Sequence, residues 1–262
     1  MVKLKIRENR ILEKNRQGKK ALGLGLSFPV FQAVELVGLL AQFDYIYLDG
    51  EHGTFSSESI ADLCRVADGY DLTVVARVPN LEKSTINIFL DQGVMGIVAP
   101  KVNTPEQART LVSVCRFEPE GNRDWSSYSR GNFYNDHDFF LKVGSSDMDL
   151  NAARKKFITQ LNQETLIIAQ LESKTAFENL DAILQVEGIY AFMGGIGDLA
   201  LSMGYPGQQD SPIVKKAMKD MKDRVHAAGR KIMSDVMEHT MLSALILDGA
   251  RKFVTEHCDH PK

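Results

Sequence analysis

Short apolar runs alternate with longer amphipathic stretches along most of the chain. Most of these runs lack the polar–apolar alternation of a half-exposed strand, and are typical of parallel strands buried on both faces. Eight runs are expected as strands, over residues 21–26, 45–48, 73–78, 96–99, 166–171, 189–193, 231–235 and 252–255. The pattern between them predicts helices over 29–41, 57–67, 82–92, 105–115, 174–185, 212–228 and 238–247. Eight strands in strict alternation with helices predict an α/β protein with a (β/α)₈ TIM barrel as a single domain over residues 1–262, and a doubly wound open sheet is the alternative.

Two irregularities interrupt this alternation. A long polar and aromatic connection over residues 118–163 follows the fourth predicted helix, where we expect a lid, an interface arm or a partly disordered segment. The run over 252–255 is followed by a segment too short for a full eighth helix. One flank of the barrel is therefore expected to stay uncovered unless the segment over 6–15 or a partner subunit packs there. We expect a homo-oligomer on that ground.

Composition and charge narrow the class of protein. The chain has 31 basic and 34 acidic residues, for a formal net charge of −3, which gives no reason to expect nucleic acid or a membrane surface as a partner. Cys64, Cys115 and Cys258 are odd in number and widely spaced, so a reducing cytoplasm is expected rather than a disulfide framework. The basic start lacks a signal peptide's apolar run, and no stretch approaches the roughly 18 apolar residues of a membrane span.

Two acidic residues end neighbouring predicted strands. Glu172 closes the run over 166–171, and Asp198 follows the run over 189–193 and a glycine-rich turn. Because the carboxyl ends of parallel strands share one face of a β/α protein, both carboxylates are expected at the active-site face. Such an oxygen-rich site suits a divalent cation such as Mg²⁺, Mn²⁺ or Co²⁺.

Other polar residues are expected at the same carboxyl-end face of the barrel, which we call the mouth. His52 and Arg77 lie at or just beyond the ends of two further predicted strands, and Gln170 lies near the end of the strand that Glu172 closes. A cation, an arginine and free backbone N–H groups together suit a 2-oxo acid, since the arginine stabilises the charge of the enolate that forms. An imidazole titrates near neutral pH, so His52 is a candidate for moving a proton.

Several blocks of sequence resemble one known family. They are FDYIYLDGEH at 43–52, VARVP at 75–79, LDQGVMGIVAP at 90–100, QLES at 170–173, VEG at 186–188, GIGDL at 195–199 and MG at 203–204. In order and spacing these blocks are similar to the HpcH/HpaI aldolases, metal-dependent and pyruvate-using members of the phosphoenolpyruvate/pyruvate barrel superfamily. The resemblance covers residues from about 20 to 255 and implies a TIM barrel.

The resemblance also implies a role for each matching residue. Glu172 and Asp198 would ligate the metal, and Arg77 would face the substrate oxo group. His52, paired with Asp91, would serve the acid–base step through water.

Four positions would contact the substrate, one of them the metal ligand Asp198. Gln170 would line the pocket, and backbone N–H groups around Gly197 and Asp198 would hold the substrate carboxylate. Arg123 would bind substrate from a loop at the pocket border. The activity implied is that of a class II aldolase, which joins pyruvate to an aldehyde, or cleaves a 4-hydroxy-2-oxo acid, through a metal-bound pyruvate enolate.

The chain departs from the family pattern at several points. Asp124 and Trp125 stand in that loop where small residues are usual, so we expect altered acceptor specificity or lost turnover. Ile196 stands where proline is usual, and the usual final helix that packs on a neighbouring subunit is not expected, which puts the family's usual hexamer in doubt.

Alternative functions stay open from sequence. One keeps the enolate but changes the electrophile, as in citrate-forming or decarboxylating relatives. Another is a Schiff-base aldolase using Lys101 or Lys252, and a third is a 2-oxo-acid binding protein without turnover.

Overall fold

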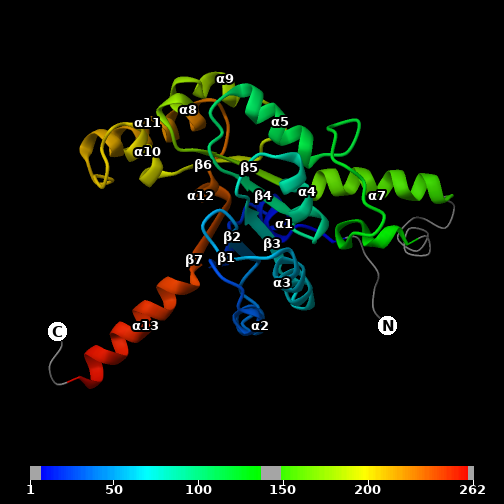
Figure 1. Ribbon diagram of the computed structural model, residues 1–262, viewed down its shortest axis with the longest axis horizontal. Coiled ribbons are helices and arrows are strands. Elements are labelled where there is room, and N and C mark those ends of the chain that lie inside the picture. The colour runs from blue at the N-terminus through cyan, green and yellow to red at the C-terminus, as the bar shows by residue number, and fades with distance from the viewer. Residues whose placement is uncertain (1–6, 137–148, 259–262) are drawn as a thin grey trace.

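Seven parallel strands form one curled sheet in the computed structural model, which describes residues 7–136 and 149–258 (Figure 1). The strands are β1 (Ala21–Leu26), β2 (Tyr45–Asp49), β3 (Thr73–Arg77), β4 (Gly96–Ala99), β5 (Leu166–Leu171), β6 (Ala191–Gly194) and β7 (Met237–Met241). Their order across the sheet is β6-β5-β4-β3-β2-β1-β7. This is an incomplete (β/α)₈ barrel, which confirms the predicted fold class.

Helices alternate with the strands along the chain, and most of them pack on the outside of the sheet. They are α1 (Arg10–Arg16), α2 (Phe31–Leu39), α3 (Ser57–Gly69), α4 (Lys83–Asp91), α5 (Pro105–Cys115), a 3₁₀ helix (Arg130–Asn135), α7 (Leu150–Glu164), α8 (Lys174–Glu178), α9 (Leu180–Leu184), α10 (Ile196–Ser202), α11 (Pro212–Ala227), α12 (Met233–Val236) and α13 (Leu242–His257). Helix starts carry their expected signals. Thr104, for example, caps α5 in a capping box ahead of Pro105.

Side chains on each strand alternate between the barrel interior and the helix layer. In β2, Ile46 and Leu48 join the outer cluster under the helices, whereas Tyr45 and Tyr47 join the inner cluster. The same alternation turns Asp49, the last residue of β2, towards the inside at the carboxyl end. The strand pattern thus brings a charged residue to the mouth on an otherwise apolar interior.

Two glycines in β1 make room for large side chains inside the barrel. A Cβ atom at Gly23 would collide with the Tyr45 ring, and one at Gly25 would collide with the Met241 sulfur. The interior therefore holds Tyr45 and Tyr47 from β2 and His239 from β7, whose ring stacks on Tyr47 at 4.3 Å between centroids.

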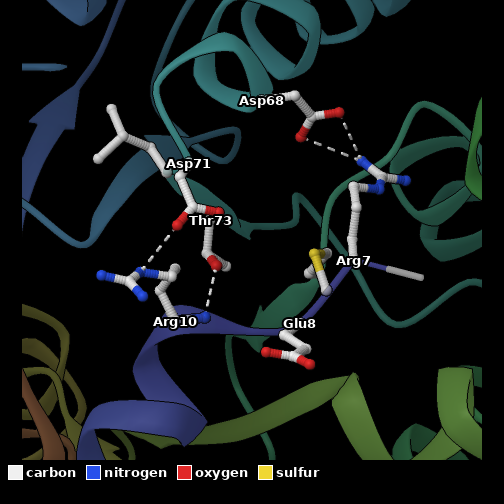
Figure 2. A pocket seen from close by; sticks show the side chains of 8 residues that line it. Arg7, Glu8, Arg10, Asp68, Asp71 and Thr73 are labelled. Carbon is white, nitrogen blue, oxygen red and sulfur yellow. Dashed lines mark hydrogen bonds and ion pairs between the residues drawn. The ribbon is translucent and has the colours of Figure 1, made fainter. Parts of the chain in front are cut away.

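The amino-terminal segment closes the end of the barrel opposite the mouth. Ile11 and Leu12 of α1 pack into the inner cluster. Figure 2 shows the approach to α1, where Arg7 turns towards Asp68 at 3.3 Å and the Arg10 backbone N–H donates to Thr73 Oγ1 at 2.8 Å, around a cavity of about 130 Å³.

The last predicted elements differ from the structure. Of the strand expected over 231–235, Ile232 makes one isolated bridge to Phe192, and α12 begins at the next residue. The predicted helix over 238–247 begins instead as β7, which pairs with β1 in the place of an eighth strand. Three polar residues, Glu238 to Thr240, stand between Met237 and Met241, so this strand lacks the continuous apolar run that marks the earlier ones.

The strand expected over 252–255 is wrong, because these residues lie within α13. Their short apolar core is flanked by charges that suit a helix: Arg251 pairs with Asp248, and Lys252 with Glu256. The expectation that a full final helix is absent is also wrong, because α13 has 16 residues and directly follows β7. This helix extends away from the barrel and buries none of its residues (Figure 1).

The long connection after α5 is packed rather than open where the structure describes it. Trp125 contacts Phe117 and Phe157 in a small apolar cluster with α7. The expected lid or arm falls partly on residues 137–148, which lie outside the described residues. No helix in the described part of the chain has the length and apolar character to cross a membrane.

Candidate active site

The carboxyl ends of the strands bring five charged residues to one mouth. Asp49 ends β2, Arg77 ends β3, and Glu51 lies in the turn after β2. Glu172 follows β5 directly, and Asp198 lies in the first turn of α10 after β6. Parallel strand direction alone places these residues on one face, since each follows the end of its strand.

Arg77 is held by two carboxylates. Its Nε and Nη2 atoms donate to the two oxygens of Asp49 at 2.9 and 2.6 Å, and its Nη1 lies 3.3 Å from Glu51 Oε2. Burial alone would raise the pKa of Asp49, but hydrogen bonds from Arg77 and the His52 backbone N–H lower it below its usual range. The fork-to-fork geometry keeps the guanidinium charged and fixes its plane at the mouth.

Glu172 is a buried carboxylate short of positive charge. It is 2% exposed, and its oxygens accept hydrogen bonds from the Lys101 backbone N–H at 3.0 Å and from the Gln170 side-chain amide. Burial raises the pKa of Glu172, and the negative charges of Asp198 and Glu51 raise it further. A cation beside Glu172 and Asp198 would offset this crowding.

The donors present fit a hard divalent cation. Glu172 and Asp198 offer carboxylate oxygens, and the Gln170 Oε1 atom is buried without a hydrogen-bond partner. Within residues 7–136 and 149–258, no group of three or more His, Cys, Asp or Glu side chains is arranged as a metal site. A cation here would therefore complete its shell with water or substrate oxygens.

The glycine-rich turn before α10 approaches this pair closely. A Cβ atom at Gly195 would collide with Glu172 Oε2 and lie 2.9 Å from Gln170 Nε2. Gly195 is therefore required for the turn to pass over Glu172. At Gly197 the nearest atom to an added Cβ is 3.5 Å away, so packing does not demand glycine there.

His52 lies at the mouth, and Asp91 lies elsewhere. The His52 backbone N–H donates to Asp49 Oδ1 at 3.2 Å, and its ring Nε2 lies 3.9 Å from Glu51 Oε2. Asp91 is the last residue of α4, and helices of a barrel return towards the amino ends of the strands. Its ion pair is with Arg123 at 3.5 Å. Within this chain the structure does not bring His52 and Asp91 together.

Arg123 also lies away from the mouth. Its side chain is buried, with the guanidinium 4.5 Å above the Phe117 ring. Burial lowers the pKa of Arg123, and the charge of Asp91 opposes that effect. Asp124, the next residue, accepts hydrogen bonds from Lys83 at 2.6 Å and Asn87 at 3.0 Å. This loop is thus fastened to α4 and to the cluster around Trp125 rather than to the strand ends.

Sequence reasoning assigned no single role to Asp49 or to Glu51. Asp49 and Arg77 are direct neighbours in the β2–β3 register, which is why their side chains meet. Lys101, considered only as a Schiff-base lysine, holds Glu172 through its backbone and Glu51 through its ammonium at 3.1 Å. Strand alternation could have identified Asp49, because it places this acid on the inward face at the end of β2, opposite the inward-facing Arg77 at the end of β3.

Comparisons with known proteins identify a family for this chain. The sequence model for HpcH/HpaI aldolase/citrate lyase matches residues 36–259. The chain is 31% identical over 226 residues to the 2-keto-3-deoxy-L-rhamnonate aldolase of Escherichia coli K12, covering 85% of this chain and 77% of that protein. It is 28% identical over 215 residues to the 4-hydroxy-2-oxovalerate aldolase of Rhodococcus jostii RHA1, covering 82% and 76%.

Solved structures show the same fold. An HpcH/HpaI aldolase from Desulfitobacterium hafniense DCB-2 superposes with a TM-score of 0.79 at 23% identity, over 95% of this chain and 97% of that one. Macrophomate synthase superposes with a TM-score of 0.74 at 22% identity, over 97% and 93%. On the strength of the sequence match over most of its length, this chain belongs to the HpcH/HpaI aldolase/citrate lyase family.

Proposed function

We propose that the protein is a divalent-metal-dependent class II aldolase that forms and cleaves 4-hydroxy-2-oxo acids, with pyruvate and an aldehyde as the partners. One observation carries the proposal. Arg77, fixed by Asp49, shares the mouth with Glu172, whose raised pKa reflects burial and the neighbouring charge of Asp198. The guanidinium of Arg77 is fixed in place, and the carboxylates of Glu172 and Asp198 beside it can hold a metal ion. This arrangement suits the binding of a 2-oxo acid and the stabilisation of its enolate.

Glu172 and Asp198 would hold the cation, which would be Mg²⁺, Mn²⁺ or Co²⁺. When bound, it would act as a Lewis acid on the 2-oxo group. Arg77 would donate to the oxygen on which negative charge develops, because its guanidinium is already oriented and needs no reorganisation. Backbone N–H groups around Gly197 and Asp198 would bind the substrate carboxylate.

His52 would manage the proton of the 4-hydroxyl group. Its side chain is 63% exposed at the mouth, so the ring can reach an acceptor aldehyde that enters from solvent. During cleavage the ring takes the hydroxyl proton as the carbon–carbon bond breaks, and during addition it returns that proton.

The protonation of Lys101 disfavours the Schiff-base alternative. A hydrogen bond and ion pair with Glu51 raise the pKa of Lys101, so the amine stays protonated and is a poor nucleophile. Lys252 lies on α13, paired with Glu256 and away from the mouth.

Two further proposals concern the oligomeric state and the cellular location of the protein. We propose a homo-oligomer, which is supported by exposed apolar side chains on α13: Leu245, Ile246, Leu247, Phe253 and Val254. We propose a cytoplasmic location, supported by the buried thiols of Cys64 and Cys115.

Exchange of pyruvate methyl protons in D₂O, followed by NMR, tests enolate formation directly. We expect exchange with added Mn²⁺ or Mg²⁺, its loss with a chelator, and its loss in Arg77→Ala and Glu172→Ala. An aldehyde panel then identifies the acceptor. Covalent trapping of the protein by borohydride in the presence of pyruvate would refute the proposal. Methyl-proton exchange that continues unchanged in the presence of the chelator would also refute it.

A further inference from the structure

Lys101 holds a backbone conformation that lysine rarely adopts. Its φ is +55°, in the left-handed region, where the Cβ atom crowds the backbone. Ala41 and Asp71 share this conformation, but each follows a helix, where a left-handed residue commonly completes the cap. Lys101 lies instead in the turn between β4 and α5. Helix capping therefore does not explain its conformation, and the contacts of the turn must stabilise it.

Lys101 contacts two carboxylates of the mouth with two different groups. Its backbone N–H donates to Glu172 Oε1 at 3.0 Å, and its ammonium donates to Glu51 Oε1 at 3.1 Å. The next backbone N–H, that of Val102, donates to the Gln170 carbonyl at 3.1 Å and ties the same turn to β5. Glycine would adopt this backbone more easily and offer the same N–H, but it would lack the contact with Glu51. The ammonium is therefore what distinguishes lysine from glycine at this position.

The acids of the mouth differ in the charges that face them. Both oxygens of Glu51 face a cation, since Oε1 has the Lys101 ammonium at 3.1 Å and Oε2 has Arg77 Nη1 at 3.3 Å. Glu172 accepts instead from amide groups, one of them the Lys101 backbone N–H. Burial raises the pKa of Glu172, and the charges of Asp198 and Glu51 raise it further, so the three acids are electrostatic neighbours. Among these three, the ion pairs that the structure shows within its described residues are all made by Glu51.

We propose that Lys101 keeps Glu51 out of the coordination shell of the metal. Lys101 is a positioning residue, because its ammonium occupies the Glu51 oxygen that a cation beside Glu172 and Asp198 would otherwise recruit. A cation held by two carboxylates leaves more of its shell to water and substrate oxygens, whereas a third carboxylate would take one of those positions. The inference rests on the metal site of the proposed function and adds the residue that limits its acidic ligands to two.

A simpler explanation gives Lys101 only its charge. Its side chain is 61% exposed, and its pKa is raised by Glu51 first and then by Asp198 and Glu172. An ammonium near a cation site weakens cation binding by repulsion through space, whatever Glu51 does. The two explanations differ in one respect. Repulsion persists when residue 51 is neutral, whereas recruitment of Glu51 needs its charge.

Mn²⁺ affinity, measured by calorimetry on the chelator-treated full chain, separates these explanations. Lys101→Met removes the ammonium and keeps the length of the side chain, so we expect Mn²⁺ to bind about tenfold more tightly. In a Glu51→Gln background the same change should give no such gain, because the charge that it would release is already absent. An equal gain in both backgrounds would show repulsion alone, and no gain beside an intact Glu51 would show that the ammonium does not withhold it. Either result would overturn the inference.

Two further variants control for the backbone and for surface charge. Lys101→Gly removes the ammonium but adopts the left-handed conformation freely, so the N–H stays on Glu172 and the gain should match that of Lys101→Met. A gain in Lys101→Met alone would come from a displaced turn and would also overturn the inference. Lys174→Met, which breaks an exposed pair with Glu178, should leave Mn²⁺ affinity unchanged, and an equal gain there would make surface charge the cause instead.

The inference and the proposed function fail in different ways. If the wild type binds Mn²⁺ and exchanges pyruvate methyl protons, but Lys101→Met binds Mn²⁺ no more tightly, the inference is wrong and the aldolase proposal stands. If the wild type binds no divalent cation, both are wrong.

Discussion

The pair of Asp49 and Arg77 gives the sharpest test of how the mouth is held. Asp49→Asn keeps the shape of the side chain but removes the charge that receives two guanidinium hydrogen bonds at 2.9 and 2.6 Å. Both side chains are 14% exposed, so the pair is neither fully buried nor at the surface. A hydrogen bond to a charged group contributes about 1.5–3 kcal/mol, and Glu51 at 3.3 Å remains as a partner for Arg77. We therefore expect a loss of about 2 kcal/mol in the free energy of unfolding.

Urea unfolding followed by circular dichroism measures this loss. The matched control is Asp62→Asn, which breaks an exposed pair with Arg65 and should cost at most about 1 kcal/mol. Arg77 should also lose its orientation, with kcat falling by about 100-fold. If Asp49→Asn costs no more stability than Asp62→Asn, the reasoning about this partly buried pair is wrong.

The same pair predicts how stability depends on pH. The pKa of Asp49 is lower in the folded protein than in the unfolded chain, so its contribution is present above about pH 4 and is lost as pH falls through the folded value. The stability difference between wild type and Asp49→Asn should therefore be constant near neutral pH and shrink on acidification. A difference that grows towards low pH would contradict the assignment.

Three further predictions follow from the site and from α13. Gly195→Ala places a methyl group against Glu172, so Mn²⁺ affinity by calorimetry should fall at least about tenfold, whereas Gly249→Ala, which meets no atom within 4 Å, should leave it unchanged. Mn²⁺ at 100 times its Kd should stabilise the wild type by about 2.7 kcal/mol in thermal or urea unfolding. Asp198→Ala should abolish that gain, and an equal gain in the variant would place the metal elsewhere. Replacing Leu245 and Phe253 of α13 by Asp should lower the molar mass measured by light scattering, whereas Lys252→Ala should not; an unchanged mass would rule out α13 as the contact.

The first six strands could be predicted from sequence because burial on both faces leaves a clear signal. The runs over 21–26, 96–99 and 166–171 match β1, β4 and β5 residue for residue. The signal weakens after α11, where apolar runs are short and mixed with charge. Residues 252–255 read equally well as strand or helix, and the ion pairs that favour a helix need residues outside that short window: Glu256 for Lys252, and both Asp248 and Arg251 for the other pair.

For the site, sequence identified which polar residues follow strands but not which of them touch. The prediction that Glu172 and Asp198 ligate a metal remains a proposal, supported by their electrostatic interaction. The contacts of Asp91 and Arg123 with each other depend on how α4 packs against the connection after α5, which no local pattern encodes. Trp125 likewise packs on Phe117 and Phe157, two residues far apart in the chain.

The barrel has a seam, because β6 and β7 are not neighbours in the hydrogen-bonded order and Phe192 and Ile232 form an isolated bridge there. Asn15 of α1 spans this seam: its amide donates to the Val236 carbonyl at 2.8 Å, and its oxygen accepts from the Tyr190 hydroxyl at 2.8 Å. Each of the other junctions is a ladder of several hydrogen-bonded residues, so opening of the barrel should begin at the seam. Helix α1 thus links the residue before β7 to the residue before β6 across the seam. Backbone amides beside the seam should exchange with solvent before those of β2 to β5.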